Sequence, residues 1–275
     1  MPSPDPTPDD TDDNLGLTHE LTIASQAARA AGAIQMELYE RLVSIDFKSE
    51  KDVVTEADHL SEAAILEIVG RAFPGDGFLA EESGESGAAG AAADRLWVID
   101  PLDGTVNYAN GIPFFAVSIG LVIAGEPVLG VVLDPTRDEL FTAVRGGGAF
   151  LDGRPIHCAN KPRIGDTVVH LGLPRSGFAQ QNTDFRRAVR IVRAMGSATL
   201  AMAYLANGRF DGYVQYQGLS TWDICAAGVI AIEGGAIVTS RQGGNWFALD
   251  MPSKSISIVA AAPPHHASFL ELLAG

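Results

Sequence analysis

The stretch Trp97-Val-Ile-Asp-Pro-Leu-Asp-Gly-Thr105 joins an apolar run to a dense group of oxygen-bearing residues. Pro101 fixes a turn at the edge of the predicted strand. The side chains of Asp100 and Asp103 can then point into the same space, with the Leu102 carbonyl facing them. This short segment therefore offers three oxygen ligands for a hard cation such as Mg²⁺.

The stretch ends with Gly104 and Thr105, which are predicted to begin a short helix. Free N–H groups at the amino end of a helix can hold a phosphate group beside the metal ligands. The alternative is that Asp-Pro and Asp-Gly are ordinary turn dipeptides, in which each Asp caps its own backbone. Taken alone, the stretch does not decide between these two interpretations.

Two more acidic segments lie at comparable places in the predicted structure. Glu81 and Glu82 directly follow a predicted strand, and Asp223 lies at the start of a predicted helix. Taken singly, Asp223 is typical of a helix N-cap, and one of the two glutamates is expected to be a solvated charge. Because Mg²⁺ needs oxygen ligands from several converging elements, the three segments together favour a metal site.

The composition narrows the class of protein. With 275 residues, 47% of them hydrophobic, the chain can build a sizeable core, and its net charge of −15 argues against a nucleic-acid partner. The sequence has no apolar run of about 18 residues and no signal-peptide pattern, so we expect neither membrane insertion nor secretion. Cys158 and Cys225 indicate neither a disulfide framework nor a zinc site, which favours a cytoplasmic location.

The chain divides into a tail and one catalytic unit. Residues 1–16 are rich in Pro and Asp and are predicted to be a disordered acidic tail. Residues 17–275 are expected to form two halves of sheet and helices, at about 17–165 and 166–275. The spacing of apolar residues predicts helices over about 17–43, with Thr18 as a cap, and over 55–73, 183–194, 197–207 and 222–233. It predicts strands near 78–80, 96–99, 114–123, 128–133, 140–144, 168–171, 212–216, 236–239 and 256–261. The pair His265–His266 is expected to be exposed.

Four motifs, in this order, resemble those of the inositol monophosphatase family of magnesium-dependent, lithium-sensitive phosphatases. They are Asp52-Val-Val-Thr-Glu-Ala-Asp58, Glu81-Glu-Ser83, Trp97-Val-Ile-Asp-Pro-Leu-Asp-Gly-Thr105 and Trp222-Asp-Ile-Cys-Ala-Ala-Gly228. Together with the segment Phe114-Phe-Ala-Val-Ser-Ile-Gly120, these motifs extend the resemblance over roughly residues 18 to 275. The fold that it implies is an α/β (α+β) layered αβαβα sandwich of the sugar-phosphatase type, commonly found as a homodimer.

The resemblance also implies roles for individual residues. It makes Glu81, Asp100, Asp103 and Asp223 the metal-binding carboxylates, with the Leu102 carbonyl as a further ligand, for two or three Mg²⁺ ions. Thr105 matches the hydroxyl that holds the attacking water together with Glu81, and Asp58 matches the carboxylate that orients this hydroxyl. The implied substrate contacts are Gly104, Thr105, Gly196, Ser197, Ala198 and Asp223.

The sequence departs from the family pattern at two positions. Ala80 precedes Glu81 where the family usually has Gly, which is a minor change. The inositol phosphatases also place a glutamate seven residues before the aspartate of the Trp-Asp motif, and Tyr216 occupies that offset here, flanked by Gln215 and Gln217. We therefore assign Tyr216 to the substrate pocket and predict that the polyol-binding part of this pocket is altered.

The predicted activity is hydrolysis of a small phosphate monoester by in-line attack of water, because no nucleophilic motif for a phosphoenzyme is present. The expected substrate is inositol 1-phosphate or a related polyol or sugar phosphate. The alternatives are fructose 1,6-bisphosphate, histidinol phosphate and 3′-phosphoadenosine 5′-phosphate, which relatives hydrolyse. An alternative of a different class is a catalytically silent regulatory protein with the same fold.

Overall fold

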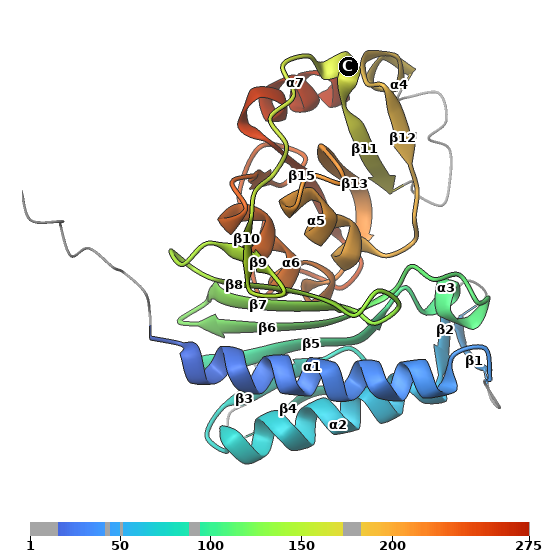
Figure 1. The fold of residues 1–275 in the computed structure, drawn as a ribbon, viewed down its shortest axis with the longest axis vertical. Helices are drawn as coiled ribbons and strands as arrows, with labels where there is room; N and C mark the ends of the chain where they lie inside the picture. Colours follow the sequence, from blue (N-terminus) through green and yellow to red (C-terminus); the bar gives the residue numbers. More distant parts are fainter. Residues whose placement is uncertain (1–15, 42–44, 50–51, 88–93, 173–182, 275) are drawn as a thin grey trace, which may run out of the picture.

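The protein is a five-layered sandwich of helices and sheets. Figure 1 shows, from bottom to top, α1 with α2, a large sheet, α5 with α6, a smaller sheet, and α4 with α7. This confirms the αβαβα architecture that the family resemblance implied. The computed structural model describes residues 16–41, 45–49, 52–87, 94–172 and 183–274. The predicted acidic tail, apart from Gly16, lies outside these residues.

Among the described residues, the helices are α1 (Thr18–Leu38), α2 (Glu56–Ala72), α3 (Thr105–Ala109), α4 (Thr183–Ala188), α5 (Ala198–Ala206), α6 (Thr221–Glu233) and α7 (Pro263–Ala274), with a 3₁₀ turn at Ile164–Asp166. The strands up to the middle of the chain are β1 (Ile45–Ser49), β2 (Asp52–Thr55), β3 (Gly77–Ala80), β4 (Gly84–Gly87), β5 (Arg95–Asp103), β6 (Ala116–Ile123) and β7 (Glu126–Asp134). The later strands are β8 (Glu139–Val144), β9 (Ala149–Leu151), β10 (Arg154–Ile156), β11 (Val168–Gly172), β12 (Ile191–Arg193), β13 (Gly212–Leu219), β14 (Ile237–Thr239) and β15 (Ile256–Ala261).

The large sheet has eight strands in the order β10-β9-β8-β7-β6-β5-β3-β4. Its central strands are buried on both faces, which explains the nearly continuous apolar runs of β5, β6 and β7. One face packs against α1 and α2 in a core that includes Ala28, Ile65 and Trp97. The opposite face packs against α6.

Helices α5 and α6 lie between the two sheets and are therefore apolar on nearly every side. Eight of the nine residues of α5 are buried. Helix α6 approaches the large sheet at Gly120 and Gly130, which face each other on β6 and β7. A Cβ atom at Gly130 would lie 2.2 Å from the Ala226 carbonyl oxygen, so a larger residue there would push α6 away from the sheet. These two glycines set the position of the helix that carries Asp223.

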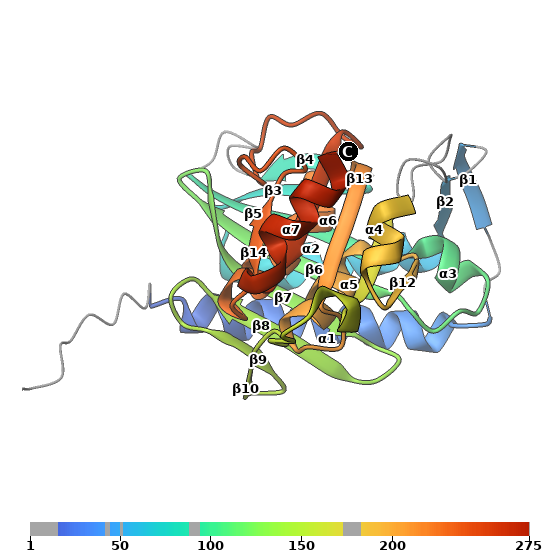
Figure 2. The same ribbon diagram turned by 90° about the horizontal axis from the view of Figure 1, so that it is seen from above.

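The smaller sheet has five strands in the order β12-β11-β13-β15-β14. Strands β11 and β13 are parallel, so their carboxyl ends meet at the same edge. The outer face of this sheet is covered by α4 and α7, as the perpendicular view in Figure 2 shows, in a core that includes Phe185, Val259 and Phe269.

The β1–β2 hairpin and α3 lie together at one end of the molecule in both views. Strand β2 leads into α2 through Thr55, which caps that helix. The sequence did not predict the hairpin, but its place is important because the residues that follow it approach α3.

Two predicted helices are shorter than expected. Helix α1 ends at Leu38, because Tyr39 is extended and Glu40 has a φ of +60°. Thr18 is the first residue of this helix and does not cap it, since the N-cap position belongs to Leu17. Helix α4 ends at Ala188, and the residues that follow form β12. The β-branched residues of β12 favour a strand and pair with β11, so the helix ends earlier than predicted.

The carboxyl-terminal segment also differs from the prediction. It forms α7, and His265 and His266 are only 4% and 5% exposed. His265 Nε2 lies 2.6 Å from the Lys161 carbonyl oxygen, and His266 Nε2 lies 3.0 Å from Thr239 Oγ1. The two histidines therefore attach the last helix to the body of the protein. Within the described residues, no helix is both long enough and apolar enough to span a bilayer.

Candidate active site

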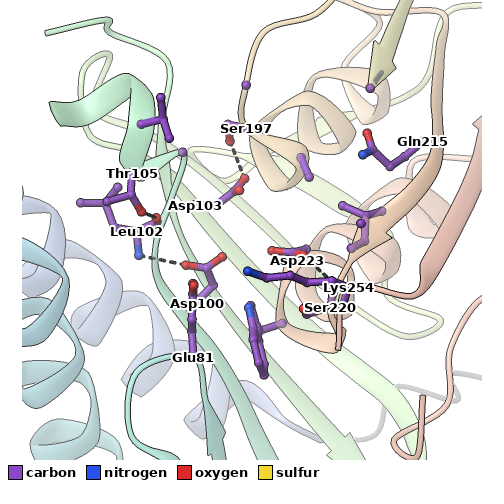
Figure 3. Close-up of a pocket in the computed structure, with 18 of the residues that line it drawn as sticks. Glu81, Asp100, Leu102, Asp103, Thr105, Ser197, Gln215, Ser220, Asp223 and Lys254 are labelled. Carbon is purple, nitrogen blue, oxygen red and sulfur yellow. Dashed lines mark hydrogen bonds between the residues drawn. The ribbon is translucent and has the colours of Figure 1, made fainter. Parts of the chain in front are cut away.

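A pocket of about 680 Å³ opens where β5, α3, α5, α6 and the end of β13 meet. Figure 3 shows acidic side chains converging on it from several of these elements. It brings together most of the predicted site residues, namely Glu81, Asp100, Leu102, Asp103, Gly104, Thr105, Gly196, Ser197, Ala198 and Asp223. Asp58 and Tyr216 are the two predicted site residues that are not part of its lining.

A β-bulge places Asp100 and Asp103 on the same face of β5. The strand does not end at Asp100 but continues to Asp103, pairing Asp100 with Ser118 and Asp103 with Ala116 on β6. Three residue steps on β5 therefore oppose two on β6. Without this extra residue, side chains three positions apart on a strand would lie on opposite faces of the sheet. Pro101 is tolerated at the bulge because no ladder hydrogen bond is needed from it.

Glu81 reaches the same place from the neighbouring strand. Strand β3 runs parallel to β5, and the Glu81 N–H donates to the Ile99 carbonyl oxygen over 3.1 Å. The turn that follows is held by Glu62, whose two carboxylate oxygens accept the backbone N–H groups of Glu82 and Ser83, each at 2.9 Å. Glu62 is only 4% exposed. Its carboxylate therefore fixes the backbone of the turn that presents Glu81.

Asp223 comes from the first turn of α6. It occupies the N3 position of a capping box, and its Oδ2 accepts the Ser220 N–H at 2.6 Å. The N-cap residue is Ser220, so the interpretation of Asp223 as the N-cap residue itself is wrong. The same carboxylate both closes the amino end of α6 and faces Asp100 and Asp103.

The carboxylates form a compact acidic group. One oxygen from each of Asp100, Asp103 and Asp223 lies within 4.8 Å of the others. Burial raises the pKa of Asp100 well above its ordinary value, and the charge of Glu81 raises it further. Burial and the charge of Asp103 likewise raise the pKa of Asp223. Such a set of buried, mutually repelling oxygen ligands fits divalent cations, which would relieve both costs.

Asp103 is also held by α5, from the other side of the pocket. Its Oδ2 accepts the Ser197 hydroxyl and the Thr199 N–H, the latter at 2.7 Å. Ser197 is the N-cap of α5 and is 1% exposed. The Ser197 hydroxyl, which the resemblance assigned to the substrate, thus has Asp103 as its partner.

The segment that leads into α5 depends on Gly196 and Asn107. Gly196 has a φ of +86°, and a Cβ atom there would lie 2.8 Å from Asn107 Nδ2. This amide donates to the carbonyl oxygens of Phe114 and Met195, each at 2.7 Å. Asn107 therefore attaches α3 to the segment before α5.

Thr105 and Asp58 form a hydrogen-bonded pair beside the acidic group. Thr105 Oγ1 lies 3.1 Å from Asp58 Oδ1 and 3.0 Å from the Leu102 carbonyl oxygen. The other oxygen of Asp58 accepts both the N–H and the hydroxyl of Thr55, at 2.8 and 2.7 Å. Burial raises the pKa of Asp58, and the hydrogen bonds from Thr55 oppose this rise. Asp58 is therefore fixed in a position to orient the Thr105 hydroxyl.

The assignment of Tyr216 to the pocket is wrong. Its ring packs with Val214 and Val259 in the core on the outer face of the smaller sheet, and the Arg241 guanidinium lies 5.3 Å from the centre of the ring. The preceding residue, Gln215, lines the pocket instead. Consecutive residues of a strand face opposite sides, so counting seven residues back from Asp223 selected the wrong face.

A wide bulge follows Gln215 and Tyr216 at the end of β13. Gln215 pairs with Ile258 and Leu219 with Ile256, so four steps on β13 oppose two on β15. Gly218, with a φ of +103°, permits the bulge. The Gln215 side chain lies directly over Gly172, because a Cβ atom at Gly172 would come within 1.2 Å of its Oε1.

Sequence reasoning also missed Glu62, Asn107 and Lys254. Glu62 lies four residues after Asp58 on α2, on the buried side of the helix, and this helical spacing was a usable signal. Lys254 lines the pocket next to Asp223 (Figure 3) although it is thirty-one residues farther along the chain. No local motif marks Lys254 or Asn107.

Known proteins resemble this chain over most of its length. The sequence profile described as the inositol monophosphatase family matches residues 17–274. The chain is 40% identical to Nus factor SuhB of Pasteurella multocida over 88% of its length and 91% of that protein. It is 39% identical to an inositol-1-monophosphatase of Mesorhizobium japonicum over 82% of its length and 86% of that protein.

Two solved structures show the same fold. The extragenic suppressor protein suhB of Bartonella henselae superposes with a TM-score of 0.84 at 34% identity, covering 93% of this chain and 98% of that one. The inositol monophosphatase of Anabaena superposes with a TM-score of 0.82 at 35% identity, covering 94% and 96%.

Proposed function

Because the chain belongs to the inositol monophosphatase family, we propose that it is a magnesium-dependent phosphomonoesterase that hydrolyses a small polyol or sugar phosphate. The observation that carries this proposal is the meeting of Asp100, Asp103 and Asp223 in one pocket with Thr105. The proposed metal site and a group that could hold the attacking water are thereby adjacent.

The metal ligands that we propose are the carboxylates of Glu81, Asp100, Asp103 and Asp223 with the Leu102 carbonyl, for two or three Mg²⁺ ions. All five residues line the pocket, and their oxygen atoms are of the type that Mg²⁺ prefers. Asp100 would hold metal together with Asp103 and Asp223, whose carboxylate oxygens lie within 4.8 Å of its own. The ions would supply neutralisation of negative charge and a lowered pKa for the attacking water.

The attacking water is held by Thr105 and Glu81 in this proposal. When Thr105 Oγ1 donates its hydrogen to Asp58 Oδ1, a lone pair on Oγ1 remains to accept a hydrogen from the water. The water oxygen is then directed at phosphorus, with its own lone pair available for in-line attack. Asp58 keeps this direction fixed because Thr55 holds its other oxygen.

The phosphoryl group would bind where α3 begins, at Gly104 and Thr105, and both residues line the pocket. The leaving group would then extend toward Gly196, Ala198 and Gln215. Inositol 1-phosphate and related polyol or sugar phosphates remain the proposed substrates, with fructose 1,6-bisphosphate, histidinol phosphate and 3′-phosphoadenosine 5′-phosphate as alternatives. The neutral Gln215 in the pocket wall supports a departure from strict inositol selectivity.

A catalytically silent regulatory role is the second candidate, because several relatives carry the name Nus factor SuhB. The complete set of predicted ligands and the Thr105–Asp58 pair favour turnover, since loss of activity usually removes such residues first. We also propose a homodimer in a reducing compartment such as the cytoplasm, and both cysteines are free thiols.

The test is release of inorganic phosphate from a panel of phosphate esters. We expect activity with added Mg²⁺, loss of activity in excess chelator and recovery when Mg²⁺ is restored. Lithium at millimolar concentration should inhibit, because the proposed second metal position could accept Li⁺ in place of Mg²⁺. Full activity in chelator would exclude the metal-dependent mechanism, and no phosphate release from any ester would favour the regulatory role.

A further inference from the structure

A buried amide on α1 holds the backbone between two of the proposed metal ligands. Gln35 is fully buried, and its Nε2 donates to the Pro101 carbonyl oxygen over 2.6 Å. Pro101 is itself buried and lies in the bulge of β5, between the pairs that Asp100 and Asp103 make with β6. A buried carbonyl oxygen needs a hydrogen-bond donor. Gln35 supplies one from the helix layer that lies below the large sheet in Figure 1.

The other end of the same peptide unit meets a proposed ligand. The Leu102 N–H donates to Asp100 Oδ1 over 3.0 Å, as a dashed line in Figure 3 shows. A trans peptide unit is planar, so its carbonyl oxygen and its N–H point in opposite directions. The hydrogen bond from Gln35 to the Pro101 carbonyl oxygen therefore also fixes the direction of the N–H group that Asp100 accepts.

Asp100 depends on this N–H group because little else can orient its carboxylate. The residue is 1% exposed, and the oxygen atoms of Asp103 and Asp223 lie within 4.8 Å of its own. The two oxygens of a carboxylate are joined rigidly, so a bond that fixes Oδ1 also fixes Oδ2. Rotation of the peptide between Pro101 and Leu102 would displace Asp100 and, through the next bond, the Leu102 carbonyl.

The rest of the buried face of α1 consists of small residues without polar side chains, namely Ala24, Ala27, Ala28, Ala31 and Gly32. Gln35 is the exception, and within the described part of the chain its Oε1 is buried without a hydrogen-bond partner. A buried amide with an unpaired oxygen is unfavourable for folding. The hydrogen bond to Pro101 is therefore the contribution that distinguishes this side chain from an apolar one of the same size.

We propose that Gln35 is a positioning residue, which orients Asp100 for cation binding through the peptide unit that joins Pro101 to Leu102. This inference rests on the proposed function, because the cation ligands are those named there. Gln35 does not line the pocket and acts only through the backbone. Its loss should weaken cation binding more than it slows turnover at saturating cation or destabilises the fold.

The test measures cation affinity in the absence of substrate. Metal-free protein is titrated with Mn²⁺, which prefers the same oxygen ligands as Mg²⁺, and the EPR signal of the free ion gives the dissociation constant. Gln35→Met nearly keeps the side-chain volume and removes the donor. We expect the dissociation constant to rise about tenfold, as for other residues that orient metal ligands. The thermal midpoint of the metal-free protein should change little, because a lost hydrogen bond and a removed unpaired oxygen oppose each other.

Tyr108→Phe is the matched control, because it removes a different hydrogen bond to the same residue. The Tyr108 hydroxyl donates to the Gln35 backbone carbonyl oxygen over 2.7 Å and joins α1 to α3. We expect the Mn²⁺ dissociation constant of Tyr108→Phe to stay within about twofold of that of the unmodified protein. An equal rise in both variants would overturn the inference, since the general attachment of α1 would then explain it. An unchanged affinity in folded Gln35→Met would also overturn it.

A second variant, Gln35→Asn, decides the question if Gln35→Met does not fold. Its amide is one carbon atom shorter and should not reach the Pro101 carbonyl oxygen, so we expect the same rise in the dissociation constant. An affinity equal to that of the unmodified protein would contradict the inference.

The Mn²⁺ titration also separates this inference from the proposed function. Binding that weakens in Gln35→Met and not in Tyr108→Phe supports the inference even if no phosphate ester is hydrolysed. Equal binding by Gln35→Met and the unmodified protein contradicts it even if phosphatase activity is found. Absence of Mn²⁺ binding in the unmodified protein would overturn both.

Discussion

The two ends of the pocket are held by different kinds of structure. At the carboxylate end, Asp103 and Asp223 each accept a backbone N–H group from a helix start, and Asp58 accepts one from Thr55. At the proposed leaving-group end, Gln215 lies at the beginning of a wide bulge in β13. The carboxylate end is held in place by hydrogen bonds from the backbone, whereas the leaving-group end depends on loop geometry that a few substitutions can alter.

We infer from this difference that residues at the carboxylate end determine the chemical step and that residues at the leaving-group end determine the choice of substrate. A proposed ligand that is buried, paired and anchored should tolerate no change, because its position and charge are both fixed by neighbours. A residue on the bulge should alter the choice of substrate and leave the metal-dependent step intact. Substitutions at the two ends should therefore affect different kinetic constants.

The largest effect is expected for Asp100→Asn, which removes the charge of a proposed metal ligand from the buried end. We expect kcat to fall by roughly two orders of magnitude or more, with the thermal midpoint unchanged or raised, since a repelling buried charge is lost. The measurement is steady-state kinetics at saturating Mg²⁺ with circular dichroism as the fold control. A variant with near-normal kcat would mean that Asp100 is only a turn residue.

A smaller effect is expected for Gln215→Glu, at the other end. The new carboxylate would accept a hydrogen bond from a substrate hydroxyl, worth about 1.5–3 kcal/mol for a charged acceptor. We expect the kcat/KM ratio of myo-inositol 1-phosphate to glycerol 2-phosphate to rise about tenfold. Gln26→Glu, exposed on α1 and not part of the pocket lining, is the matched control. If both variants raise the ratio equally, the effect is one of general charge and not of Gln215.

Glu62→Gln tests whether the first end owes its rigidity to residues that are not ligands. An amide nitrogen in place of one carboxylate oxygen would face a backbone N–H group of Glu82 or Ser83, so the turn that presents Glu81 should loosen. We expect the half-saturating Mg²⁺ concentration to rise about fivefold, while kcat at saturating Mg²⁺ changes little. Glu67→Gln, exposed on the same helix, is the control. An unchanged Mg²⁺ dependence would limit Glu62 to a structural role.

The smallest effect is expected for Tyr216→Phe. The ring packs away from the pocket, so removal of its hydroxyl should leave the substrate ratios within about twofold. The same panel of esters measures this. A shift above fivefold would show that the two faces of β13 communicate and would weaken the distinction between core and pocket.

The sequence alone could predict the carboxylate end, because its residues lie in short motifs. Asp100 and Asp103 are three residues apart, Thr105 follows at once, and the capping pattern around Asp58 is local. The structure brings these residues together as the motifs indicated. The layered architecture followed from the family resemblance and not from the spacing of apolar residues.

The leaving-group end could not be predicted because its geometry depends on strand register. The alternation along β13 places Gln215 and not Tyr216 toward the pocket, and a count back from Asp223 does not reveal which face of the strand a residue occupies. The turn that carries Lys254 is attached to the site through Ser220. The short α4 has the same origin, since pairing of β12 with β11 overrides a helical pattern.

The anchoring of Asp103 by Ser197 and Thr199 has a thermodynamic consequence. Strand β5 supplies the carboxylate, α5 supplies its hydrogen-bond donors, and Asp223 on α6 completes the cluster. A cation whose ligands come from all three elements would bind the folded chain and not the unfolded one. At a free concentration one hundred times its dissociation constant, such a cation would add about 2.7 kcal/mol to the free energy of unfolding. Scarcity of the ion would then shorten the lifetime of the protein in the cell as well as slow its turnover, because proteases act on the unfolded fraction.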